Sequence, residues 1–127
     1  MSTKRDWINW ALGFTAGAFL ASWLALSCAP GHAQSVPDLI DQAAAQEGIP
    51  WAARHLARIA WCESRWFPGA YNRSSGASGV FQFLPSTWAW ASRAAGWAGY
   101  SPFDAVANVY AAAYLYRVGG PRHWVCA

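Results

Sequence analysis

A single carboxyl stands among tryptophans near the middle of the chain. Glu63 lies in the run Trp61-Cys62-Glu63-Ser64-Arg65-Trp66, at the predicted end of an apolar helix. Apolar surroundings disfavour the charged form of a carboxyl, so its pKa rises and it stays protonated closer to neutral pH. Such a group can act as a general acid that donates its proton to a leaving oxygen, for example the oxygen of a glycosidic bond.

A turn rich in small residues follows Glu63 and carries an amide between two aromatic rings. Residues 75–79 read Ser-Gly-Ala-Ser-Gly and lead into Val-Phe-Gln-Phe at 80–83. Hydroxyl and amide groups bind the polar substituents of a sugar, while aromatic rings pack against its face. We therefore predict a substrate groove with contacts from Ser64, Ser75, Ser78, Phe81 and Gln82. Helix capping for Gln82 and Ser64, and turn formation for Ser75 and Ser78, are the structural alternatives.

The other carboxyls have simpler predicted roles. Asp38, Asp41 and Glu47 lie on a polar helix, and Asp104 precedes an apolar helix that it is expected to start. Glycosidases of the usual kind use two carboxyls, and no second candidate is close to Glu63 in sequence. Folding can still bring Asp104 near, so the sequence leaves the number of catalytic carboxyls open.

Four helices are predicted to position these residues. Proline or a polar cap marks the starts of segments 37–48, 50–63, 85–95 and 103–118. Glycine marks the ends of all but segment 50–63, which is placed by an apolar stripe at residues 53, 56, 57 and 60. Residues 67–79 are rich in Pro, Gly, Asn and Ser, which indicates a long loop with a small hairpin. The pattern predicts one α+β domain that is predominantly helical, with a small loop or hairpin lobe.

The chain resembles the lytic transglycosylase family, whose fold is lysozyme-like, over roughly residues 36–127. The resemblance is strongest for a secreted variant with a Cys before the Glu and another near the C-terminus. It rests on matches in order and spacing at Glu63-Ser64, Asn72, Ser75-Gly76-Ala77, Gly79 to Trp88, Asp104 with Asn108, Ala113-Tyr114-Leu115 and Gly119-Gly120. It implies a cleft between a helical lobe and residues 67–84, with Gln82 and Tyr114 facing the substrate. Phe81 and Phe83 stand where the family usually has an aliphatic residue and often Met, and both keep the apolar character of these positions.

The family resemblance also implies a reaction that needs one carboxyl. Lytic transglycosylases cleave the β-1,4 bond between N-acetylmuramic acid and N-acetylglucosamine in peptidoglycan. A single Glu, here Glu63, acts as acid and then as base, and the substrate acetamido group supplies the nucleophile. The product is a 1,6-anhydromuramic end. A lysozyme-type hydrolase of the same fold and an inactive wall-binding module are the alternatives.

The N-terminus indicates export. Lys4 and Arg5 precede an apolar run over residues 7–27, and Gly31-His32-Ala33 suits a signal peptidase. Residues 1–33 are therefore expected to be a signal peptide, with a domain at 34–127. A retained membrane anchor through residues 7–27 and a lipoprotein attached at Cys28 are the alternatives. All three place the domain outside the cytoplasm, as a secreted, periplasmic, wall-associated or membrane-anchored protein.

The remaining cysteines form one predicted pair. Cys62 and Cys126 are 126 − 62 = 64 residues apart, and a disulfide between them is expected in an oxidising compartment. Two unrelated thiols are the alternative.

Composition and histidine spacing limit the classes of ligand that the chain is expected to bind. The formal net charge is +3, and there is no run of Lys and Arg, so we expect no nucleic-acid binding. His55 and His123 are not spaced as metal ligands, so no metal site and no cofactor are expected. A monomer is the default expectation.

Overall fold

The first helix of the domain is α2 (Val36–Gln46), in a computed structural model that describes residues 33–127. Ser35 and Asp38 form a reciprocal capping box at its start, and Gly48, with a φ of 73°, follows its end. The predicted signal or anchor segment and Cys28 lie outside the described residues. Among residues 33–127, no helix combines the length and hydropathy needed to cross a bilayer.

Helix α3 (Ala53–Ser64) carries Glu63 in its last turn, as predicted. A 3₁₀ turn, η2 (Pro50–Ala52), leads into it. Its buried face consists of Leu56, Ile59 and Ala60. Two successive left-handed residues, Arg65 (φ 56°) and Trp66 (φ 60°), end the helix. Such a backbone conformation is uncommon for side chains of this size, and it turns the chain sharply away from the helix axis.

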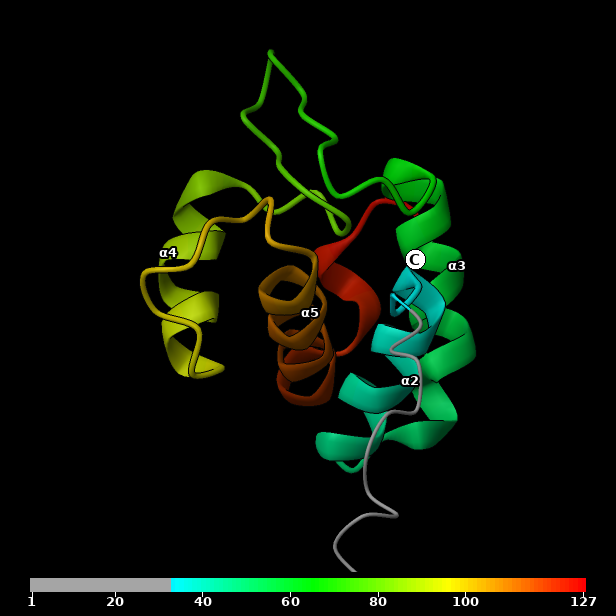
Figure 1. Ribbon diagram of the computed structural model, residues 1–127. Helices are drawn as coiled ribbons and strands as arrows, with labels where there is room; N and C mark the ends of the chain where they lie inside the picture. The colour runs from blue at the N-terminus through cyan, green and yellow to red at the C-terminus, as the bar shows by residue number, and fades with distance from the viewer. Residues whose placement is uncertain (1–32) are drawn as a thin grey trace, which may run out of the picture. The chain divides into compact units, whose positions relative to one another are not determined.

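Residues 65–84, here called the hairpin loop, cross the end of the helical bundle (Figure 1). Their pairing consists of two isolated antiparallel bridges, Tyr71 with Ser78 and Ser78 with Phe83. At the tip, the side chain of Asn72 accepts hydrogen bonds from the amides of Ser74 and Ser75 at 2.9 and 3.3 Å. These tight turns leave no length for a regular strand within the described residues. The predominantly helical prediction is confirmed, whereas the α+β class is not.

Helix α5 (Ala105–Gly119) is the central element and packs against both α2 and α4 (Pro85–Ala94), as Figure 1 shows. Asp104 caps it by accepting a hydrogen bond from Ala107 N at 2.9 Å, which confirms its predicted role as a helix start. Gly120 ends α5, and a short 3₁₀ turn, η3 (Pro121–His123), follows. The small residues Ala111, Ala112 and Ala113 are all buried and let the neighbouring helices approach closely.

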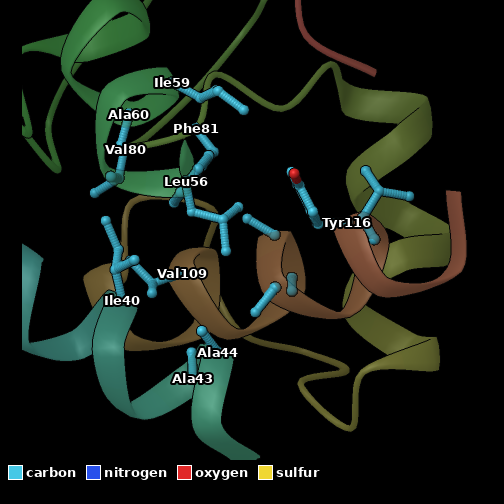
Figure 2. Packing of buried hydrophobic residues seen from close by; sticks show 14 of the residues in the cluster. Ile40, Ala43, Ala44, Leu56, Ile59, Ala60, Val80, Phe81, Val109 and Tyr116 are labelled. Carbon is cyan, nitrogen blue, oxygen red and sulfur yellow. The ribbon is translucent and has the colours of Figure 1, made fainter. Parts of the chain in front are cut away.

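The core joins the helices to the hairpin loop. Figure 2 shows Ile40 of α2, Leu56 of α3, Phe81 of the hairpin loop and Val109 of α5 converging on one buried region. Trp124, just after η3, closes the cluster, and its indole nitrogen donates a 3.1 Å hydrogen bond to the carbonyl of Phe81. Because the loop contributes core residues, it is held against the helices by burial as well as by hydrogen bonds.

Candidate active site

The Glu63 carboxyl is partly buried at the C-terminal end of α3. Burial raises the pKa of Glu63 above the ordinary glutamate value, and the backbone of Cys126 acts in the opposite direction with a smaller effect. The direction agrees with the predicted role of a general acid, since a higher pKa keeps more of the carboxyl protonated near neutral pH.

The two tryptophans that bracket Glu63 in sequence pack on another side of α3. Residues two positions apart on a helix diverge by about 200° around its axis, so Trp61 and Glu63 point in nearly opposite directions. Trp61 packs against Trp66 with ring centroids 4.9 Å apart, and the Trp66 indole donates a 2.9 Å hydrogen bond to the carbonyl of Ala57. The burial of Glu63 therefore has a different source from the one that its sequence neighbours indicated.

A disulfide pins the C-terminal segment to the end of α3. Cys62 and Cys126 are bonded, as predicted, with their Cα atoms 5.9 Å apart. In Figure 1 the red C-terminal segment runs from beside α5 to the end of α3. Because Cys62 precedes Glu63, the bond places the backbone of Cys126 beside the Glu63 carboxyl.

Ser64 ties the end of α3 that carries Glu63 to the hairpin loop. Its hydroxyl lies 2.7 Å from the carbonyl oxygen of Val80 and 3.1 Å from that of Ala60. The single hydroxyl proton is therefore directed at the backbone. These contacts fix the distance between the helix end and the segment that carries Gln82.

Gln82 has a strained backbone and a firmly held side chain. Its φ is 50°, in the left-handed region. The side-chain nitrogen Nε2 donates hydrogen bonds to the carbonyls of Ala70 (3.1 Å) and Gly79 (3.0 Å). Among the hydrogen bonds of residues 33–127, none involves its amide oxygen, so that acceptor remains for a ligand. A cavity of about 70 Å³ adjoins it, lined by Gln82, Phe83, Leu84, Thr87, Leu115, His123 and Trp124.

The predicted contacts Ser75 and Ser78 both hydrogen-bond within the hairpin loop. The Ser75 hydroxyl accepts from Ala77 N at 3.2 Å and is exposed at the tip. The Ser78 hydroxyl donates to the carbonyl of Gly76 at 2.9 Å, and the residue is only 6% exposed. Ser75 is thus reachable by a ligand, whereas Ser78 mainly shapes the turn.

Phe81 lies in the core. The sequence predicted it as a groove contact, but its side chain has no exposed surface and packs against Trp124 with centroids 5.7 Å apart. Phe81 and Gln82 are neighbours whose side chains point to opposite sides of the loop, so that Phe81 faces the core and Gln82 is partly exposed.

Tyr114 is partly buried on α5, and the Arg117 guanidinium lies 5.2 Å from its ring centroid. One half-turn further, Tyr116 is buried, and its hydroxyl makes a 2.9 Å hydrogen bond with Nδ1 of His55 on α3. Sequence reasoning did not identify this pair. Its two members are 61 residues apart, and neither lies in a recognisable motif.

Asn108 joins the hairpin loop to α5, and sequence reasoning gave it no role of its own. It has no exposed surface, accepts from Phe81 N at 2.9 Å, and donates to the carbonyls of Pro102 and Ser78 at 2.8 and 3.3 Å. One side chain of α5 thereby satisfies backbone groups from two separate loops. The available signals were an Asn inside an otherwise apolar helix and its place, with Asp104, in the family resemblance.

The other acidic side chains of the described residues have structural tasks or face solvent. Asp38 belongs to the capping box of α2, and Asp104 caps α5. Glu47 forms an ion pair with Arg117 at 2.6 Å, and Asp41 is exposed. Glu63 is thus the acidic side chain in residues 33–127 that combines partial burial with a position beside the hairpin loop.

The fold and the site together define a small helical domain with one carboxyl set at a helix end, beside a loop that presents an amide and hydroxyls. The family model described as the transglycosylase SLT domain matches residues 38–119. The chain belongs to this family.

Two curated proteins illustrate the similarity. The probable transglycosylase SceD of Staphylococcus epidermidis is 47% identical over 75 residues, which are 58% of this chain and 34% of that protein. The protein of the same name from Staphylococcus aureus (strain Newman) is 45% identical over 75 residues, 58% of this chain and 32% of that protein. The chain therefore matches about a third of the length of these relatives. No solved structure gave a significant match.

Proposed function

We propose that this domain is a lytic transglycosylase that cleaves the glycan strands of peptidoglycan, with Glu63 as its acid and base. The observation that carries the proposal is the partly buried Glu63 carboxyl, whose pKa is raised by burial, at the end of α3 beside the hairpin loop. The family membership and the names of the relatives support the reaction class.

The proposed reaction uses the same carboxyl twice. Protonated Glu63 donates its proton to the glycosidic oxygen, the bond from that oxygen to C1 of the muramic residue breaks, and the acetamido oxygen of that residue bonds to C1. The resulting Glu63 carboxylate then removes the proton from the 6-hydroxyl. Oxygen 6 displaces the acetamido oxygen from C1, giving the 1,6-anhydro ring and returning Glu63 to its protonated form.

The other predicted site residues form two groups: those that can contact the substrate, and those that hold the loop in place beside Glu63. The amide oxygen of Gln82 can accept a hydrogen bond from a substrate acetamido or hydroxyl group. Ser75 and Tyr114 are exposed enough to add contacts. Ser64, Ser78 and Phe81 position the groove through backbone bonds and burial.

We infer an exported location for the domain. A peptidoglycan substrate lies outside the cytoplasmic membrane, and the Cys62–Cys126 disulfide suits an oxidising compartment. We further propose that the N-terminal segment acts as a signal peptide or an anchor.

Product analysis tests the reaction. Purified peptidoglycan is digested with the oxidised full-length protein and, in parallel, with a Glu63→Gln variant of nearly the same shape. Muropeptides lighter by one water that resist borohydride reduction are the expected products, and the variant should form none. Reducible muramic ends would instead identify a hydrolase, and activity retained in Glu63→Gln would overturn the catalytic assignment.

A further inference from the structure

The outer face of α3 carries a groove between arginines and tryptophans, and its accessible lining is almost wholly apolar. A cavity of about 610 Å³ opens there, bounded by Arg54, Ala57, Arg58, Trp61 and Trp66. Trp61 is 44% exposed, and Arg54 and Arg58 are exposed as well. Arg65 adds a third cation, with its guanidinium 5.0 Å from the centroid of the Trp61 ring.

This groove is separate from the candidate active site. At 100° per residue, Glu63 lies about 180° from Arg54 and about 140° from Arg58 around the axis of α3. A ligand in the groove would therefore bind on the side of the helix that faces away from Glu63. In Figure 1, α3 lies at the edge of the domain with α2 on its inner side, so its outer face has no neighbouring helix among the described elements.

The floor of the groove is held rigidly. The Trp66 indole donates to the carbonyl of Ala57, and the Trp61 and Trp66 rings pack edge to face. A ligand therefore meets an aromatic surface that loses little conformational freedom when it binds.

In the part of the chain that the structure describes, the arginines of the groove have no acidic partner. Within residues 33–127 the one ion pair joins Arg117 to Glu47, so Arg54, Arg58 and Arg65 have no carboxylate within ion-pair distance there. Arg54 and Arg58 are one turn apart, about 6 Å along the axis, and Arg65 continues the line past the helix end. A row of cations interleaved with aromatic rings complements a linear polyanion better than a single small anion.

We propose that this groove binds an anionic polymer of the phosphodiester-linked polyol class. Guanidinium groups hydrogen-bond phosphate oxygens in a forked geometry, and the aliphatic units between the phosphates pack over the tryptophan rings. Such binding would hold the domain on an anionic matrix while Glu63, on the opposite side of α3, faces the glycan. The groove adds an attachment site to the proposed function without depending on catalysis.

A binding titration tests the proposal. Full-length protein is titrated with poly(glycerol phosphate), with neutral dextran of similar length, and with vesicles of phosphatidylglycerol in phosphatidylcholine. The Arg54→Gln/Arg58→Gln variant is compared with Arg93→Gln/Arg122→Gln, which removes the same charge from exposed positions outside the groove. We expect the groove variant to bind poly(glycerol phosphate) about tenfold more weakly, because two solvent-exposed charge contacts are lost.

Three results would overturn the proposal: no binding of poly(glycerol phosphate) by the wild type, equal losses in the two double variants, or a groove-dependent affinity for the vesicles alone. An Arg54→Lys/Arg58→Lys variant should recover part of the affinity, because it restores the charges without the fork. Turnover of short soluble glycans should be unchanged in all these variants. A wild-type protein that binds poly(glycerol phosphate) but shows no Glu63-dependent turnover would therefore contradict the proposed function and not the groove.

Discussion

The hydroxyl of Ser64 lies 2.7 Å from the carbonyl oxygen of Val80, sixteen residues further along the chain. This contact joins the residue after Glu63 to the segment that leads into Gln82. It therefore sets the spacing between the proposed acid and the proposed substrate contact.

Ser64→Ala should cost about 1–2 kcal/mol of unfolding free energy, because the carbonyl of Val80 loses its partner in a partly buried place. Turnover of peptidoglycan should also fall, since the hairpin loop is released from the end of α3. Urea unfolding and product formation are the measurements. Ser86→Ala, at an exposed position of α4, serves as the control and should change stability by less than about 0.5 kcal/mol. Equal urea midpoints for Ser64→Ala and wild type would show that the contact does not constrain the loop.

Glu63→Gln should stabilise the fold at neutral pH while abolishing activity. Burial raises the folded-state pKa of Glu63, so folding favours its protonated form. The stabilisation that the protonated Glu63 carboxyl gives the folded state is fully present below the unfolded-state pKa, and it is lost as pH rises through the folded-state pKa. The amide avoids burying a charge, so the melting temperature of the variant should exceed that of wild type at pH 7 and match it at acidic pH. A constant difference across pH would show that the carboxyl is not the cause.

The pKa of Glu63 should also shape the pH profile of the enzyme. Because the acid must be protonated to donate, kcat/KM should decline as pH rises through a value above the ordinary glutamate pKa. Initial rates on a soluble glycan at constant ionic strength would show this limb. A decline centred at or below the ordinary value would contradict the assignment of Glu63 as acid.

Gly79→Ala should be strongly destabilising. Its φ is 80°, and an added Cβ would lie 2.1 Å from the carbonyl oxygen of Pro102 and 2.4 Å from Nδ2 of Asn108. Backbone strain and the collision together should lower the free energy of unfolding by about 3 kcal/mol or more. Gly99→Ala separates the two effects, because Gly99 has a φ of 83° but nothing within 4 Å of the added atom. It should cost about 1 kcal/mol. Chemical unfolding of both variants measures the difference, and similar losses would mean that collision with Asn108 is unimportant.

Removing the disulfide with Cys62→Ser/Cys126→Ser should lower the free energy of unfolding by about 4 kcal/mol, because a 64-residue loop is no longer closed in the unfolded chain. Activity should fall further than stability alone requires, since the backbone of Cys126 is no longer held beside Glu63. Unfolding curves and rates should be compared at a temperature where both proteins are folded. Full activity in the folded double variant would show that the bond serves stability only.

The helices could be predicted closely because their limits are set by local chemistry. Asp104 bonds Ala107 three residues away, Pro85 stands at the start of α4, and Gly48 follows α2. Each signal acts within one turn, so the sequence alone contains it. The position of Glu63 in the last turn of α3 followed instead from the apolar stripe at residues 53, 56, 57 and 60 that leads up to it.

The surroundings of the site could not be predicted in the same way. The polar partners of Asn108 come from residues 78, 81 and 102, and proximity of such distant segments is decided by packing. The same holds for the His55 and Tyr116 pair. Adjacency was misleading for Trp61 and Phe81, because neighbours in sequence point to different sides of an element.

The Cys62–Cys126 bond encloses the whole hairpin loop in a covalent ring. Residues 71–75 at the tip of that loop are exposed, and Arg73 among them offers a site for a trypsin-like protease. A single cut after Arg73 would leave two polypeptides that remain linked through the disulfide and through a shared core. The domain can therefore be nicked at this exposed point without coming apart, and separating the two fragments would require both reduction and unfolding of the core.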